Sequence, residues 1–273
     1  MRVLISVDME GVAGVVAPED ISPGNPEYER NRGYMTDEAS AAVRGVLSAQ
    51  PDASVVVCDA HAMFRNLLPD RLDRRCTLLR GSPRMHGMLT GIDGGVDAVC
   101  FVGYHGRAGT ARSVLAHTIS GSTIACVRCD GRELGELGLN AALASHHGAV
   151  AVLATGDDTL CAEAEAVVPG ITTVEVKRAV GNRAAESLHP EEAYSRIQAA
   201  ATTALRDPVE IPRPLFDGAV DLEVDLLRPH MLERSCLIPG VEVRGRLTLG
   251  FRAADISAAC DMIEVFATFA GAG

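Results

Sequence analysis

Four side chains with metal-binding chemistry follow the first three apolar runs of the sequence. Asp8 and Glu10 come after the first run, His61 after the second and His105 after the third. Zinc takes carboxylate oxygens and imidazole nitrogens in catalytic sites, and a carboxylate can bridge two ions. Singly, each residue is better explained as a cap, a turn former or a structural hydrogen bonder. Their shared position after successive runs favours a metal site.

A further acidic ligand is available in the segment Gly131 to Asn140, which reads GRELGELGLN. Glu136 lies at the start of an expected helix, where the helix dipole favours a negative charge. A structural role therefore explains Glu136 without a metal. Spacing alone does not choose between Glu133 and Glu136 as the ligand.

The three apolar runs predict the strands that position these residues. Arg2 to Val7, Ser54 to Cys58 and Ala98 to Val102 are short and rich in β-branched side chains. Such runs are typical of parallel strands buried on both faces. In open α/β sheets the ligand site lies beyond the carboxyl ends of the strands, so the candidate ligands are expected at one edge.

The rest of the chain alternates between strand and helix patterns. A helix is expected from Thr36 to Ala49. Later expected elements are a strand pair at 114–119 and 123–129, helix 136–146, strand 150–154, helix 159–167, strand 172–176, helix 190–205, strands 219–226 and 241–249, and helix 253–270. This alternation predicts an α/β fold with a mostly parallel sheet flanked by helices, and a smaller α+β segment at the C-terminus.

A proline-rich break divides the expected elements into two parts. Asp207-Pro208 and the pair Pro212 and Pro214 mark it. We therefore expect a metal-binding catalytic α/β domain over residues 1–207 and a C-terminal α+β lobe over residues 208–273.

Composition narrows the class of function. The chain has 273 residues and a formal net charge of −11, so the basic surface of a nucleic-acid-binding protein is not expected. No apolar run approaches the ~20 residues of a membrane helix, and the N-terminus lacks the apolar region of a signal peptide. The eight cysteines mostly lie in apolar runs, as reduced buried thiols do. These features predict a cytoplasmic protein without membrane or nucleic-acid partners.

Several ordered segments resemble one enzyme family. Ser6 to Gly11, SVDMEG, is similar to the S-x-D-x-E-G signature of the zinc-dependent D-aminopeptidases. Other similar segments are Asp59-Ala60-His61, Gly103-Tyr104-His105, His117, Gly135 to Ala141, Gly156-Asp157-Asp158 and Thr172 to Lys177. The resemblance runs in order from the N-terminus to about residue 205 and is vaguer beyond it.

The resemblance implies a complete set of site residues. Two zinc ions per chain would share Asp8. One would also take Glu10 and His105, and the other His61 and Glu136, which selects Glu136 over Glu133. The family's further catalytic histidine falls on His117, as a nucleophile or a general acid/base. Asn140 is a candidate for holding the substrate, although a capping or packing role explains it equally well.

The same resemblance implies a function and an assembly. The expected enzyme is a two-zinc metallo-aminopeptidase, a hydrolase that cleaves the N-terminal peptide bond of short D-amino-acid-containing peptides with a metal-activated water. The alternatives are another two-metal amidase acting on a specialised peptide or amide, and a non-catalytic metal-binding protein. The expected partners are a small peptide substrate and further copies of the chain in a decamer whose active sites face an inner chamber.

Overall fold

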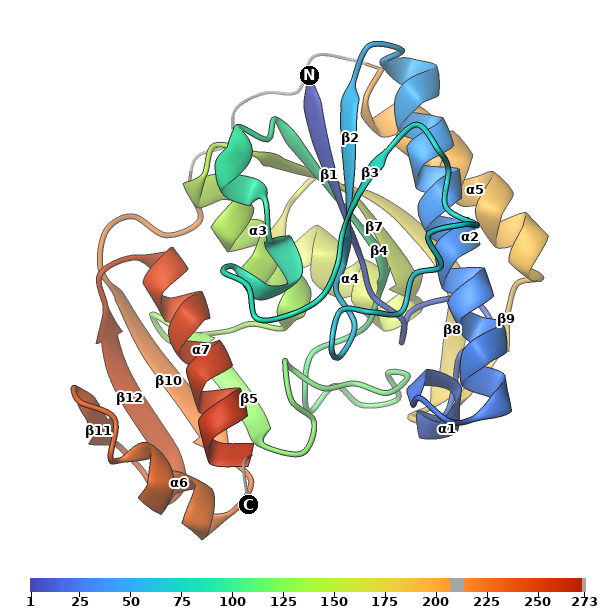
Figure 1. Cartoon of the computed structure of the whole chain (residues 1–273). Coiled ribbons are helices and arrows are strands. Elements are labelled where there is room, and N and C mark those ends of the chain that lie inside the picture. The colour runs from blue at the N-terminus through green and yellow to red at the C-terminus, as the bar shows by residue number, and fades with distance from the viewer. Residues whose placement is uncertain (207–213, 272–273) are drawn as a thin grey trace.

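The computed structural model describes residues 1–206 and 214–271 and contains two sheets (Figure 1). The strands are β1 (Arg2–Val7), β2 (Ser54–Asp59), β3 (Thr77–Leu79), β4 (Ala98–Tyr104), β5 (Ile124–Cys129), β6 (Arg132–Glu133), β7 (Val150–Asp157), β8 (Thr172–Gly181), β9 (Ala184–Ser187), β10 (Val220–Leu226), β11 (Val241–Val243) and β12 (Thr248–Ala253). The helices are α1 (Pro18–Ile21), α2 (Pro26–Ala49), α3 (Glu136–His146), α4 (Asp158–Val167), α5 (Pro190–Ala204), α6 (Pro229–Ser235) and α7 (Ile256–Gly271), with short 3₁₀ turns η1 (Gly87–Leu89) and η2 (Ile92–Gly94).

The first sheet has seven strands in the order β3-β2-β1-β4-β7-β8-β9. Neighbouring strands are parallel throughout except for the antiparallel pair β8 and β9. β1 lies between β2 and β4, so the carboxyl ends of these three strands are adjacent. The predicted α/β class with a mostly parallel sheet is confirmed.

Helices cover both faces of this sheet (Figure 1). Val3 and Ile5 of β1 belong to the core that contains α2 and α5. Leu4, between them, belongs to the core on the other face, which contains α3 and α4. Alternate residues of β1 therefore enter two different cores, and the strand is apolar throughout because both of its faces are buried.

The longest helix, α2, begins ten residues earlier than the sequence pattern predicted. It starts at Pro26 instead of Thr36. Proline is favoured in the first turn of a helix because its missing N–H would have no partner there, and Glu27 and Glu29 complement the positive end of the helix dipole. Among the described residues, no helix is both long enough and apolar enough to cross a membrane.

The second sheet is antiparallel and has the order β11-β12-β10-β5-β6. Residues of α7, including Ile263 and Phe266, belong to its core. β5 and β6 come from before residue 207, so this sheet joins strands from both parts of the chain. The boundary expected at 207/208, with Asp207, Pro208 and Pro212, lies outside the described residues.

Two of the strand predictions are wrong. Residues 114–119 form an irregular loop, in which Leu115 and Ile119 have positive φ angles of 53° and 61°. The loop's Val114 and Ile119 N–H groups donate to the carboxylates of Asp157 and Glu136, so they do not pair with a strand. Residues 241–249 form parts of two strands, β11 and β12, which pair with each other as a hairpin.

Candidate metal centre

All five expected metal ligands lie together at the carboxyl edge of the first sheet. Asp8 and Glu10 follow β1, His61 follows β2, His105 follows β4 and Glu136 opens α3. Each is buried, with 2–6% of its surface exposed. The sheet order explains this convergence, because β2 and β4 flank β1 in the parallel sheet.

Asp8 occupies the middle of this group. Its Oδ1 lies 3.4 Å from His61 Nδ1, and its Oδ2 lies 3.4 Å from His105 Nε2. His61 Nδ1 is also 3.0 Å from Glu10 Oε2, and His105 Nε2 is 3.3 Å from Glu136 Oε2. One carboxylate oxygen of Asp8 therefore faces each histidine, which is the arrangement that a bridging ligand requires.

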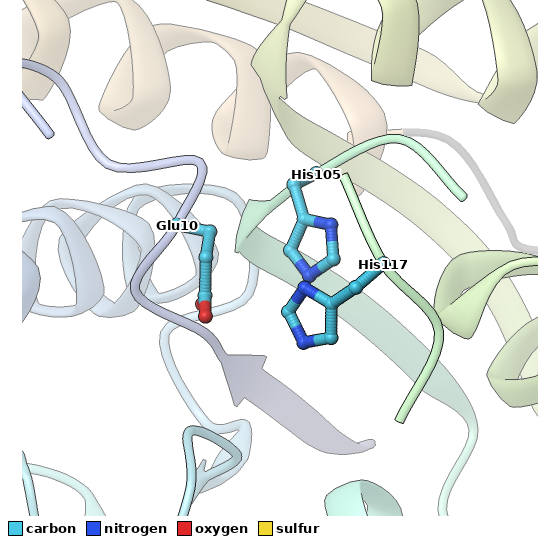
Figure 2. Close-up of side chains that lie close together, drawn as sticks. All are labelled: Glu10, His105 and His117. Atoms are coloured by element: carbon cyan, nitrogen blue, oxygen red, sulfur yellow. The ribbon is translucent and has the colours of Figure 1, made fainter. Parts of the chain in front are cut away.

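His117 comes from the irregular loop before β5 and joins the group from the side. Figure 2 shows it close to Glu10 and His105. Its ring stacks on that of His105, with ring centres 4.3 Å apart and an interplanar angle of 15°. Its Nε2 lies 3.5 Å from Glu136 Oε1, and its side chain remains 23% exposed. His117 is thus the most accessible imidazole of the group.

The three imidazoles share one hydrogen-bonding pattern. In each, one ring nitrogen lies near a backbone carbonyl oxygen: His61 Nε2 near that of Ile21 at 3.1 Å, His105 Nδ1 near that of Gly106 at 3.0 Å, and His117 Nδ1 near that of Leu115 at 3.0 Å. Because a carbonyl only accepts, that nitrogen carries the proton. In the neutral imidazole the other nitrogen, which faces the carboxylates, keeps its lone pair. Metal-binding histidines are oriented in this way.

The charges of the group call for a cation. Burial, and after it the charge of Glu10, raise the pKa of Asp8 to about 8. Burial lowers the pKa of His105, but the neighbouring Glu136 outweighs this effect and raises it to about 10. Asp8 Oδ2 and His105 Nε2 are buried without a hydrogen-bond partner among the described residues. A metal ion between them would satisfy both atoms, so the residues fit zinc.

Three sets of donors have atoms close enough to hold an ion. They are Asp8–Glu10–His61, Asp8–His105–Glu136 and Glu10–His105–His117, and within each set the donor atoms lie within 4.8 Å of one another. Two of these sets share Asp8. The division implied by the family resemblance, with Glu10 and His105 on one ion and His61 and Glu136 on the other, stays a prediction.

Two buried residues that the sequence analysis did not identify hold the loop that carries Glu10. Lys177 Nζ donates to the carbonyl oxygens of Glu10, Val12 and Val15, at 2.5, 2.9 and 2.6 Å. Glu38 in α2 accepts from the N–H of Ala13 at 2.9 Å. The sequence carried two signals for Lys177: it is the chain's single lysine, and it ends the segment Thr172 to Lys177 that resembles the family.

Gly11 allows the same loop to approach β4. Its N–H donates to the carbonyl of Gly103 at 2.8 Å, and the carbonyl of Tyr104 lies directly against its α-carbon. A Cβ at this position would collide with that carbonyl. The glycine of the SVDMEG segment therefore has a steric role, which is to bring Glu10 next to His105.

The other two candidates of the sequence analysis lie outside the group of ligands. Glu133 is exposed on β6 and lies 3.6 Å from an amino group of Arg107. Asn140 is buried, and its amide donates to the Tyr104 hydroxyl at 3.1 Å and the Met88 sulfur at 3.3 Å. Asn140 lines a hollow next to the metal centre and is absent from the lining of the metal-centre cavity.

A cavity of about 240 Å³ opens onto the metal centre. Its lining consists of Asp8, Glu10, His61, His117 and Glu136, the largely apolar wall of Ala60, Ala62, Phe64, Met88 and Ile119, and Glu264. Glu264 belongs to α7 and so comes from the second part of the chain. The space accommodates a small ligand.

The fold and this site define a metal-dependent hydrolase of the α/β class, with its centre at the carboxyl edge of a parallel sheet. The sequence profile of the D-aminopeptidase family matches residues 1–265, and the chain belongs to this family. The match extends well past residue 205, beyond which the sequence resemblance is vaguer.

A sequence match and a structural match agree with this assignment. The D-aminopeptidase of Bacillus subtilis (strain 168) is 32% identical over 262 residues, which cover 94% of this chain and 93% of the relative. A solved structure, the Zn-dependent D-aminopeptidase DppA from Bacillus subtilis, described as a self-compartmentalizing protease, superposes with a TM-score of 0.94 at 29% identity. The match covers 100% of this chain and 99% of that one.

Proposed function

We propose that the chain is a zinc-dependent aminopeptidase that releases the N-terminal residue of short peptides containing D-amino acids. Asp8, Glu10, His61, His105 and Glu136 hold two zinc ions, with Asp8 shared between them. The observation that carries the proposal is the orientation of both histidine ligands, whose proton-bearing nitrogens face backbone carbonyls while their other nitrogens face the carboxylates.

Zinc at this centre would supply Lewis-acid polarisation of the peptide carbonyl and a bound water of lowered pKa. The chain's own residues supply the rest. His117 has its Nδ1 near the carbonyl of Leu115, so its Nε2 is available to exchange a proton in the cavity. We assign two proton transfers to this atom: it accepts a proton from the attacking water and then donates it to the leaving amine.

Apolar side chains form part of the cavity lining. Phe64, Met88 and Ile119 are among them, and they provide a low-polarity surface for a small side chain. Substrate chirality is proposed from the relatives, which are both described as D-aminopeptidases.

The assembly is part of the same proposal. We propose a homo-oligomer, a decamer with its active sites facing an inner chamber. It is supported by the description of the matching solved structure as a self-compartmentalizing protease. A monomeric mass in light scattering at working concentration would contradict it.

Release of D-alanine from D-Ala-D-Ala by the zinc-loaded protein, with L-Ala-L-Ala in parallel, tests the activity. We expect release from the D form only. His117→Ala is expected to lose hydrolysis while keeping its zinc. The matched control is His146→Ala, at the end of α3 and outside the cavity lining, which should leave the rate unchanged. Full activity of His117→Ala would contradict its assigned role.

A further inference from the structure

Glu264 contributes a carboxylate to the metal-centre cavity from the C-terminal part of the chain. It lies on α7, whose apolar residues pack against the second sheet (Figure 1). In the cavity lining, every other charged or titratable side chain is either a proposed zinc ligand or His117. Glu264 is thus the one ionisable group there without a role in the proposed chemistry.

The backbone of η1 makes room for this carboxylate. Gly87 has a φ of 43°, and a Cβ built on it would lie 2.6 Å from Glu264 Oε1. A side chain at residue 87 would therefore displace the carboxylate. The absence of a side chain at residue 87 leaves this space to the carboxylate of Glu264.

The carboxylate of Glu264 has no hydrogen-bond or ion-pair partner within the described ranges 1–206 and 214–271. Arg84, the nearby cation, stacks on the ring of Phe64 at 3.6 Å and donates to the carbonyl of Asp59. Burial raises the pKa of Glu264 to about 6, so at neutral pH most of the side chain is still ionised. A half-buried anion without a donor is costly, and a ligand that brings N–H donors and a positive charge would stabilise it.

We propose that Glu264 receives the α-ammonium group of the substrate and so positions the first peptide bond at the metal centre. This inference rests on the proposed function. The free amine is the feature that distinguishes an N-terminal residue from any other residue of a peptide. An ammonium has three donors and a charge complementary to a carboxylate. An N-blocked peptide would leave Glu264 without a partner, which is how the cavity rejects it.

Binding of two ligands that differ only at the amine tests the proposal directly. The probes are D-alanine and N-acetyl-D-alanine, titrated calorimetrically into the zinc-loaded full chain. We expect the wild type to prefer D-alanine by about 10-fold or more, because a charge-assisted hydrogen bond contributes on this scale. In Glu264→Gln the preference should fall to about 2-fold or less, with the zinc content unchanged.

Asp261→Asn is the matched control. Asp261 lies on α7 one turn before Glu264 and lines the neighbouring hollow without reaching the metal-centre cavity. It should keep the wild-type preference. Glu264→Asp retains the charge one methylene further back, so it should recover part of the preference, a result that a packing role for Glu264 does not predict.

Hydrolysis provides the second readout. For D-Ala-D-Ala, Glu264→Gln should raise KM by about 10-fold or more and change kcat less, since the ammonium contact is made in the bound substrate as well as in the transition state. Asp261→Asn should change neither constant.

The outcomes separate this inference from the proposed function. Equal preference in the wild type and Glu264→Gln, or no preference in the wild type, would overturn the role of Glu264. If the wild type hydrolyses neither dipeptide yet prefers D-alanine in a Glu264-dependent manner, the peptidase proposal fails and the ammonium site stands.

Discussion

The molecule contains two clusters of acidic side chains that are compensated in different ways. On the second sheet, Asp221, Glu223, Asp225 and Glu242 each lie within 4.0 Å of an arginine nitrogen, from Arg128 or Arg244. At the edge of the first sheet, histidines are the only basic side chains at that distance from Asp8, Glu10 and Glu136 among the described residues.

The carboxylates of the two clusters also differ in how deeply they are buried. The arginine-paired carboxylates keep 29–70% of their side chains exposed, whereas those at the metal centre keep 3–4%. An exposed ion pair contributes little because water screens it, but buried carboxylates crowded together need a positive charge at the same place. The second cluster is therefore complete as a structural feature, and the first is arranged for a cation from outside the chain.

The largest expected effect comes from the shared ligand. Asp8→Asn should lower zinc-dependent hydrolysis by about 1,000-fold or more, because it removes the charge between the two proposed ions. Zinc content per chain, measured by atomic absorption, should fall with it. An Asp8→Asn protein that keeps two zinc ions and its activity would remove the distinction between the two clusters.

The next effect concerns stability. Burial raises the pKa of Glu38 from 4.5 to about 7, so the folded state binds its proton more tightly than the unfolded state. Its contribution to stability is present below pH 4.5 and is lost as the pH rises through 7, by about 3 kcal/mol. Glu38→Gln should lack this decline in urea unfolding measured from pH 5 to 8.

The control for that profile lies on the same helix. Glu29 of α2 is exposed and pairs with Arg32, so Glu29→Gln should keep the wild-type dependence on pH. Parallel profiles for the wild type and Glu38→Gln would show that the buried carboxylate does not titrate in this range.

A smaller effect is expected from the residue that holds the Glu10 loop. Lys177→Met removes the donor to three backbone carbonyls, so the loop should loosen and zinc affinity should fall by about 10–100-fold in competition with a chelator. Arg178→Met is the matched control, because Arg178 follows Lys177 in the chain and its side chain is 66% exposed. Unchanged affinity in Lys177→Met would mean that the loop is held by the fold without this contact.

The smallest effect is expected on the second sheet. Asp225→Asn breaks the two-pronged contact with Arg128, yet it should cost less than about 1 kcal/mol in urea unfolding, since the pair is partly exposed. Zinc content and hydrolysis should stay at wild-type values. A loss of zinc in this variant would show that the two clusters are coupled.

The sequence sufficed to predict the part of the centre that depends on strand ends. Asp8 and His105 directly follow buried strands and His61 comes two residues after one, and the parallel register of β1, β2 and β4 brings such positions together. Glu136 needed the family resemblance, because Glu133 and Glu136 are indistinguishable by spacing. Their environments differ in three dimensions, where one is exposed and the other buried.

The remaining features depend on contacts between distant segments. The segment 114–119 has a strand-like composition, but carboxylates of Asp157 and Glu136 take its N–H groups and turn it into a loop. Glu38 and Glu264 reach the centre or its loop from α2 and α7, and no short-range pattern relates them to it. The secondary-structure propensity of a short segment contains no information about a contact with a residue far along the chain.

The burial of the only lysine has a practical consequence for studying this protein. Lys177 is 2% exposed, and all other basic side chains of the Lys and Arg type are arginines. A lysine-specific protease therefore has a single cleavage site, after Lys177, and cannot reach it in the native fold. The rate of this one cut would report how often strand β8, which carries Lys177, opens from its neighbours β7 and β9, without any label or engineered probe.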